Sequence, residues 1–117
     1  MDGAMSYVAS VDLVAIDQAG KEVPVVFRVG APEKVSSEEW RCHVSLDGLQ
    51  EGLGFIHGAD SMQALSLALG LAVTLLREFV ARGGRLLYAG EQNKPLDESE
   101  WPLESYFGWL GDSPRAT

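Results

Sequence analysis

The sequence predicts an α+β domain in which an antiparallel β-meander of four to five strands packs on one long helix. Residues 7–57 contain short segments where apolar and polar residues alternate, as they do in strands with one buried face. Residues 61–82 instead repeat apolar side chains at helical spacing. The connections between the strands are too short for parallel crossovers, which favours the antiparallel meander. A chain of 117 residues fits a single domain, with a core at 7–90 and a C-terminal segment at 91–117.

The first two strands are predicted to form a hairpin. Residues 7–16 alternate, and their odd-numbered side chains, nearly all apolar, are expected to form the buried face. Gly20 can supply the positive φ of a tight loop before a second strand at residues 22–29. Pro24 lacks an N–H group, so its end of that strand is expected at a sheet edge.

The next segments are shorter. Residues 34–38 are expected to form a polar loop. A third strand at residues 40–46 places apolar side chains on one face, and a short fourth strand is expected at residues 55–57. A last short strand at residues 85–89 is expected to follow the helix. The apolar face of the third strand consists of Trp40, Cys42, Val44 and Leu46.

The helix predicted over residues 61–82 has a defined start and stop. Asp60 can accept a hydrogen bond from the first turn, and Gln63 can reciprocate in a capping box. Gly83 and Gly84 are typical of a C-cap. The apolar arc covers about half of the circumference, which is wider than the ~100° stripe of a surface helix. We therefore expect either the C-terminal segment or a second subunit to cover the surplus.

Charge and composition restrict the partners and the location. The net charge of −8 argues against nucleic acid, because phosphate binding needs clustered lysine and arginine. The N-terminus lacks the basic and apolar regions of a signal peptide, and the apolar stretch at residues 64–76 is too short for a membrane span. Cys42 is the only cysteine, so no intrachain disulfide can form. We expect a cytoplasmic protein without membrane contact.

No group of residues has the pattern of a catalytic or metal site. Cys42 and His43 are neighbours in a strand, so their side chains point to opposite faces, and His57 does not complete a set of metal ligands. The glycines before the helix lack a nearby lysine or arginine, and the Asp60 carboxylate would repel an anion there. We expect no enzymatic activity, no cofactor and no metal.

The segment at residues 91–117 combines acidic and aromatic side chains. A short helix is expected to start within residues 97–100. Its aromatic residues either dock on the core or form an exposed patch for a partner. The candidate protein-binding residues are Glu98, Glu100, Trp101, Glu104, Tyr106 and Trp109.

Two sequence elements carry a resemblance to a known family. Trp40-x-Cys42, and Gly58-x-Asp60-Ser61-x-Gln63-Ala64-Leu65 after it, are similar to elements of a family of small uncharacterised bacterial proteins, a domain of unknown function. The resemblance covers residues 8–90. It implies a β-meander followed by a long helix, and it implies no catalytic residues.

These observations favour a non-catalytic protein-binding role. A concrete form is an immunity-type or inhibitor protein that neutralises a basic partner protein, since the chain is small and acidic and ends in an aromatic segment. The alternative is a homo-oligomeric structural or accessory protein, a homodimer through the helix face of residues 61–82. A second alternative is a small-molecule-binding domain with a pocket between the sheet and the C-terminal segment.

Overall fold

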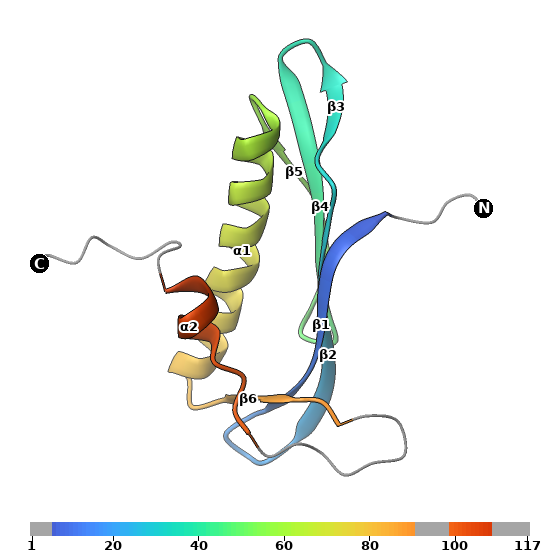
Figure 1. Ribbon diagram of the computed structural model, residues 1–117. Helices are drawn as coiled ribbons and strands as arrows, with labels where there is room; N and C mark the ends of the chain where they lie inside the picture. The colour runs from blue at the N-terminus through green and yellow to red at the C-terminus, as the bar shows by residue number, and fades with distance from the viewer. Residues whose placement is uncertain (1–5, 91–98, 109–117) are drawn as a thin grey trace, which may run out of the picture.

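The computed structural model describes residues 6–90 and 99–108. It has two layers, with an antiparallel sheet on one side and the helices α1 (Ser61–Ala81) and α2 (Leu103–Phe107) together on the other (Figure 1). This confirms the α+β class and the single long helix. The strands in chain order are β1 (Tyr7–Ile16), β2 (Glu22–Gly30), β3 (Glu33–Ser36), β4 (Glu39–Asp47), β5 (Gln50–Gly58) and β6 (Arg85–Tyr88).

The first five strands follow one another as a meander. β1 pairs with β2, β2 with β4, and β4 with β5, all antiparallel. Because β5 pairs along one edge of β4, both β2 and β3 lie in succession along the opposite edge. After α1 the chain returns to the far side of the sheet, where β6 pairs with the C-terminal half of β1.

Two parts of the sheet were not predicted from the sequence. The polar loop expected at residues 34–38 is wrong, because β3 pairs there with the start of β4. All four side chains of β3 are exposed, so no alternation of apolar residues reveals it. β5 is also longer than the expected 55–57, since Gly52 and Gly54, both at positive φ, interrupt its pattern. The sheet therefore has six strands instead of four to five.

Pro24 lies where the ladder between β2 and β4 has not yet begun. β2 is an inner strand, yet its pairing with β4 starts only at Val26. Pro24 is therefore paired with β1 alone, opposite Val14, and no ladder bond to β4 requires its missing N–H group.

Both predicted caps of α1 are present. The Asp60 carboxylate accepts a hydrogen bond from the Gln63 backbone at 2.8 Å. The Gln63 side chain accepts from the Ala59 N–H at 2.6 Å, one residue earlier than in the usual capping box. At the other end Gly83 has φ +98°, and its N–H and that of Gly84 donate to the last turn in a Schellman motif.

α1 rests on the sheet through its smallest side chains. Ala64, Ala68 and Ala72 are fully buried, and their spacing of four residues places them on one face. Gly58 at the end of β5 lies directly against the first turn of the helix. Small side chains on both elements thus allow the helix axis to approach β4 and β5, which are its main contacts.

The length and apolar composition of α1 bear on the prediction that the chain has no membrane span. Among the described residues, this helix is the one segment long and apolar enough to cross a bilayer by length and composition. The core helix of a water-soluble domain passes the same test. The location of the protein thus stays a prediction.

The described part of the C-terminal segment starts at Ser99 with a single β-bridge to β6 and not with a helix. Ser99–Trp101 runs along the outer edge of β6, with Trp101 donating to the Leu86 carbonyl at 2.7 Å. The helix expected to start within residues 97–100 instead begins at Leu103, directly after Pro102. The free edge of β6 offers backbone partners to this stretch, and proline fits at a helix start.

Two glycines, Gly58 packed against α1 and Gly70 within it, allow a paired test of this packing. A Cβ on Gly58 would lie 2.6 Å from the Ala64 backbone nitrogen, whereas a Cβ on Gly70 would meet nothing within 4 Å. We expect Gly58→Ala to lower the free energy of unfolding by about 1–3 kcal/mol. Gly70→Ala should raise it by about 0.5–1 kcal/mol. Urea unfolding of both variants measures the two values, and equal effects would contradict the close approach.

Candidate functional site

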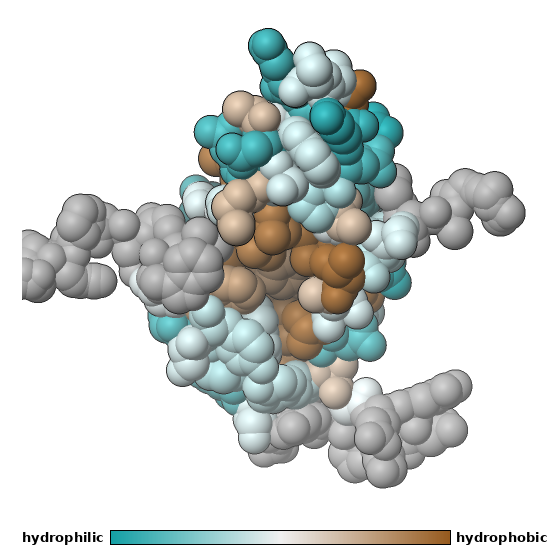
Figure 2. Space-filling view, turned by 45° about the horizontal axis from the view of Figure 1, so that its top comes forward, coloured by the Kyte–Doolittle hydropathy of each residue, from teal (hydrophilic) through white to brown (hydrophobic). Residues whose placement is uncertain are grey.

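An apolar groove lies between the N-terminal half of β1 and the two helices. Its volume is about 150 Å³. Figure 2 shows apolar atoms gathered at its mouth, surrounded by more polar surface. We call it the β1 groove, and its lining residues are Ala9, Ser10, Val11, Phe27, Val29, Leu69, Trp101, Tyr106 and Phe107.

The groove exists because one helix cannot cover the inner face of this sheet. Neighbouring strands are about 4.8 Å apart and a helix with its side chains is about 10 Å wide, so a helix covers roughly two strands. α1 lies mainly on β4 and β5, and it contacts β2 only slightly. The inner face of β1 and β2 therefore depends on the C-terminal segment for its cover.

The cover changes along β1. Leu13 and Ala15, in the half of the strand that pairs with β6, are buried. Val11 is only partly buried and Ala9 is exposed, although both share their face. The predicted apolar face of this strand is thus confirmed in its second half. In its first half Ala9 and Val11 form a wall of the groove, whereas the prediction is wrong for Tyr7, which a register shift between Tyr7 and Ala9 places on the outer face beside His43.

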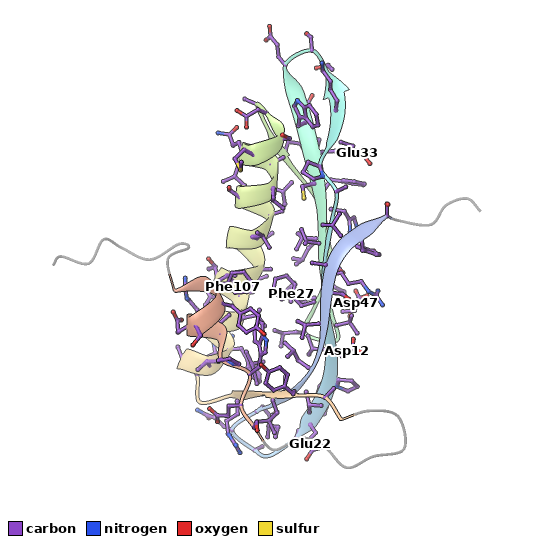
Figure 3. The ribbon with its side chains drawn as sticks, viewed as in Figure 1. Asp12, Glu22, Phe27, Glu33, Asp47 and Phe107 are labelled. Atoms are coloured by element: carbon purple, nitrogen blue, oxygen red, sulfur yellow. The ribbon has the colours of Figure 1, made fainter. Side chains whose placement is uncertain are left out.

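Four aromatic rings form the lower end of the groove. Phe27 comes from β2, and the other rings come from the C-terminal segment. The centroid of Phe27 lies 6.3 Å from that of Trp101 and 6.1 Å from that of Phe107. Figure 3 shows Phe27 and Phe107 directed toward one another between the sheet and α2. The Tyr106 ring lies 5.3 Å from Trp101 and is half exposed.

Apolar burial, more than charge, holds the C-terminal segment in place. Trp101 is 4% exposed and Leu103 is 6% exposed. Burying a tryptophan side chain is worth about 3–5 kcal/mol relative to alanine. The Arg85–Glu100 ion pair at 2.7 Å lies at the surface, with both side chains more than half exposed, and such pairs contribute little. The indole Nε1 of Trp101 has no hydrogen-bond partner among the described residues, so the ring itself supplies the stabilisation.

Arg77 joins α1 to α2. Its Nε and Nη2 lie 2.8 Å and 3.2 Å from the two carboxylate oxygens of Glu104, and Nη2 also donates to the Phe107 carbonyl. The guanidinium thus fixes both ends of the short helix. The hydrogen bond from Arg77 lowers the pKa of Glu104 below its ordinary value, and partial desolvation opposes this only in part.

The backbone of β1 is open along the groove. β6 pairs only with Leu13–Ile16, and within the described residues no strand pairs with the same edge of Tyr7–Val11. The Asp12 carbonyl, which accepts from Ala89 N–H, faces this edge. Backbone direction alternates along a strand, so Ser10 also presents its N–H and C=O groups to the open edge.

The sequence-predicted binding residues lie in different environments. Trp101 is buried in the core, and its ring also lines the lower end of the groove. The carboxylates of Glu100 and Glu104 are in ion pairs with arginines of the same chain. Tyr106 is half exposed at the groove. Glu98 and Trp109 lie outside the described residues.

The sequence pattern did not identify the sheet wall of the groove. Ala9, Val11 and Val29 have the same alternation as the residues that became core. The one indication was a surplus of apolar surface over what one helix and one sheet could cover, and that surplus was placed on the helix. In the structure Leu69 of α1 lines the groove, so both layers contribute to it.

The cysteine and the histidines are separated from one another. The Cys42 thiol is fully buried and donates to the Gly30 carbonyl at 3.3 Å. His43 lies on the opposite face of the sheet, and His57 Nδ1 lies 2.6 Å from a Glu39 carboxylate oxygen. In the ranges 6–90 and 99–108, no three His, Cys, Asp or Glu side chains are close enough to hold a metal ion together.

The outer face of the sheet carries a second cluster of rings. His43 lies between Tyr7 and Phe55, at centroid distances of 5.8 Å and 5.1 Å. The guanidinium carbons of Arg28 and Arg41 lie over Tyr7 and Phe55 at 5.3 Å and 3.9 Å. Each arginine is also ion-paired with a carboxylate of the same face. Because these charges are already matched within the chain, the cluster is weaker than the β1 groove as a candidate site.

A family model described as a domain of unknown function, DUF6968, matches residues 13–97. The chain belongs to the DUF6968 family. This confirms the expected relation to an uncharacterised family, while a bacterial origin stays a prediction. No curated protein and no solved structure matches the chain. The DUF6968 match includes the part of the groove formed by β2 and α1, and the match excludes Ala9, Ser10 and the segment at residues 99–108.

Burial predicts a slow reaction of the single thiol. Desolvation raises the pKa of Cys42, so the reactive thiolate is scarce at neutral pH, and the closed core excludes reagents. We expect a water-soluble thiol reagent to label the native protein at least about a hundredfold more slowly than the unfolded chain. Absorbance of the released chromophore follows both rates, and equal rates would contradict the buried position.

The Arg77–Glu104 contact predicts a defined dependence of stability on pH. The pKa of Glu104 is lowered in the folded state, so the contact stabilises the fold above the unfolded-state pKa of glutamate, about 4.3. This contribution is lost as the pH falls through the lowered pKa. Urea unfolding of wild type and Glu104→Gln at several pH values should show a gap at neutral pH that closes in acid. Arg77→Gln should show the same pH-dependent part of the gap and keep a residual gap in acid, because it also removes the hydrogen bond to the Phe107 carbonyl. A gap that does not change with pH in either variant would contradict the prediction.

Proposed function

We propose that this DUF6968 chain is a non-catalytic protein-binding domain of the cytoplasm, and that it binds its partner at the β1 groove. The observation that carries the proposal is the position of an uncharged apolar groove beside an unpaired strand edge. Exposed apolar surface next to free backbone groups is what an interacting chain can cover and pair with.

The size and chemistry of the groove favour a protein over a small molecule. Pockets for small ligands usually measure about 300–1,000 Å³ and contain a few converging polar groups. The β1 groove measures about 150 Å³, and its lining includes no charged side chain. That volume suits one or two apolar side chains that a larger partner inserts.

Charge favours a basic partner. The chain carries a net charge of −8, so a second copy or another acidic protein is repelled at long range, whereas a basic protein is attracted. The immunity-type or inhibitor role expected from the sequence is one biological form of this proposal. We propose that its contact residues are those of the groove, because the carboxylates of Glu100 and Glu104 are already in ion pairs with Arg85 and Arg77 of the same chain.

The alternative homodimer through α1 has less surface available. Leu69 of that helix faces the groove, and Leu65, Leu75 and Phe79 pack against the core. The large apolar side chains of α1 that are clearly exposed are Met62, Leu67 and Val80. They are spread from the first turn of α1 to its last. The proposal therefore places the interface at the groove.

A charge placed in the groove should abolish partner binding. Ala9 is exposed and lines the groove, so Ala9→Glu puts a carboxylate where the partner's apolar side chain would lie without disturbing the core. Val35→Glu is the matched control, because Val35 is an exposed apolar strand residue on β3, away from the groove. We expect Ala9→Glu to weaken binding at least about tenfold, by roughly 1.4 kcal/mol.

The measurement is affinity capture from an extract of the source cells, followed by dissociation constants for the captured protein. A partner that binds wild type and Val35→Glu but not Ala9→Glu supports the proposal. A partner that binds all three proteins equally contradicts the groove as the site. If light scattering shows that the wild-type chain is a dimer and that Ala9→Glu is a monomer, the groove binds a second copy of this chain. The proposal of a heterologous partner would then be wrong.

A further inference from the structure

We infer that the partner binds by β-strand addition: a short extended segment pairs with the open edge of β1, inserts apolar side chains into the β1 groove, and places a lysine or arginine beside Asp12. This inference rests on the proposed function and specifies how the partner is recognised. Three features of the edge carry it: its backbone direction, the face on which each neighbouring side chain lies, and one acidic side chain that makes no ion pair within residues 6–90 and 99–108.

The backbone of Ser10 is oriented for such pairing. Asp17 N–H donates to the Lys21 carbonyl, which sets the odd-numbered residues from Ala9 to Ala15 as those of β1 that bond to β2; the register shifts between Tyr7 and Ala9, where this pattern ends. Ala9 and Val11 therefore satisfy their backbone groups within the sheet. Ser10, between them, points its N–H and C=O groups outward to the edge where β6 has not yet begun. An added strand would exchange backbone hydrogen bonds with this residue.

The side chains of an added strand would alternate between two different surfaces. Those opposite Ala9 and Val11 share the inner face of the sheet and would enter the groove above the aromatic rings. The side chain opposite Ser10 would lie on the outer face, on the side away from the helices. A partner segment with the order apolar, basic, apolar would place its apolar side chains in the groove and its basic side chain on the outer face.

Asp12 supplies the charge selectivity on that outer face. Figure 3 shows Asp12, Glu33 and Asp47 on the side of the sheet away from the helices. Glu33 and Asp47 are paired with arginines, whereas Asp12 makes no ion pair with any described residue. A long basic side chain opposite Ser10 lies diagonally from Asp12, within the reach of such side chains across a strand pair.

The geometry also limits the length and identity of the added strand. The pairing of β6 covers Leu13–Ile16 of β1, and the Ala89 N–H already occupies the Asp12 carbonyl. Among the described residues, the stretch of β1 with no strand on this edge is therefore Tyr7–Val11, and it contains a register shift between Tyr7 and Ala9. A second copy pairing through this segment would contribute no lysine or arginine, because its residues are Tyr7, Val8, Ala9, Ser10 and Val11. Self-pairing would thus leave Asp12 unmatched, and a heterologous basic segment fits better.

A proline at position 10 isolates the backbone contribution. Ser10→Pro removes the outward N–H group and leaves the bonds between β1 and β2 in place, since those come from the neighbouring residues. Ser10→Ala is the control that keeps the N–H group. The probe is a short synthetic peptide of alternating valine and lysine, titrated into the full-length protein and followed by NMR chemical shifts.

We expect binding of this peptide to wild type and Ser10→Ala, with the Ser10 amide protected from hydrogen exchange. Ser10→Pro should weaken it about tenfold. Asp12→Asn should weaken it about twofold to fivefold, because a single exposed ion pair contributes modestly. Glu22→Gln, an exposed acidic residue on the same strand pair but away from the edge, should change it by less than about twofold.

Two further peptides keep the inference falsifiable if Ser10→Pro lowers the thermal stability. A valine–lysine peptide in which the backbone amides of the lysines, the residues that would pair with Ser10, are N-methylated should not bind, and a valine–glutamate peptide should bind at least about tenfold more weakly than the lysine peptide. Equal binding of the N-methylated peptide would overturn strand addition, and equal binding of the glutamate peptide would overturn the charge selectivity.

The inference can fail separately from the proposed function. If a captured partner loses binding in Ala9→Glu but not in Ser10→Pro, the groove is the binding site and strand addition is wrong. If the free protein is dimeric and Ser10→Pro makes it monomeric, the edge pairs with a second copy and the inference is overturned.

Discussion

The width of the sheet relative to its one long helix determines most of this structure. α1 approaches β4 and β5 closely because Ala64, Ala68 and Ala72 form its contact face and Gly58 leaves room for its first turn. That close approach stabilises one side of the inner face and leaves the other side, on β1 and β2, without a helix. A six-stranded sheet with one helix therefore needs a second cover, or it keeps apolar surface in contact with water.

The described part of the C-terminal segment, residues 99–108, supplies that cover only in part. Its strand-like start satisfies the outer edge of β6, and Trp101 and Leu103 complete the lower core. α2 is five residues long, too short to reach the upper half of β1. The β1 groove is the part of the inner sheet face that neither α1 nor the described part of this segment covers. Its apolar character and its uncharged lining follow from that origin.

Local sequence patterns predicted those elements in which the order of apolar and polar side chains follows their burial. Alternation identified β1, β2 and β4, and the caps identified α1. β3 could not be predicted in this way, since its backbone pairs while all its side chains stay exposed. The groove could not be predicted either, because Ala9 and Leu13 share a pattern and differ only in what lies over them. For the same reason the residue type of Trp101 suggested a partner contact, whereas its position makes it part of the core.

The groove is lined partly by buried residues inside the DUF6968 match and partly by exposed residues outside it. Phe27 and Val29 are buried and belong to the matched DUF6968 region, so substitutions there affect the fold. Ala9, Ser10 and Tyr106 are exposed, lie outside the match and contribute little to the core. Substitutions at these exposed positions can therefore change the shape and polarity of the groove surface while the buried residues beneath it keep the fold unchanged.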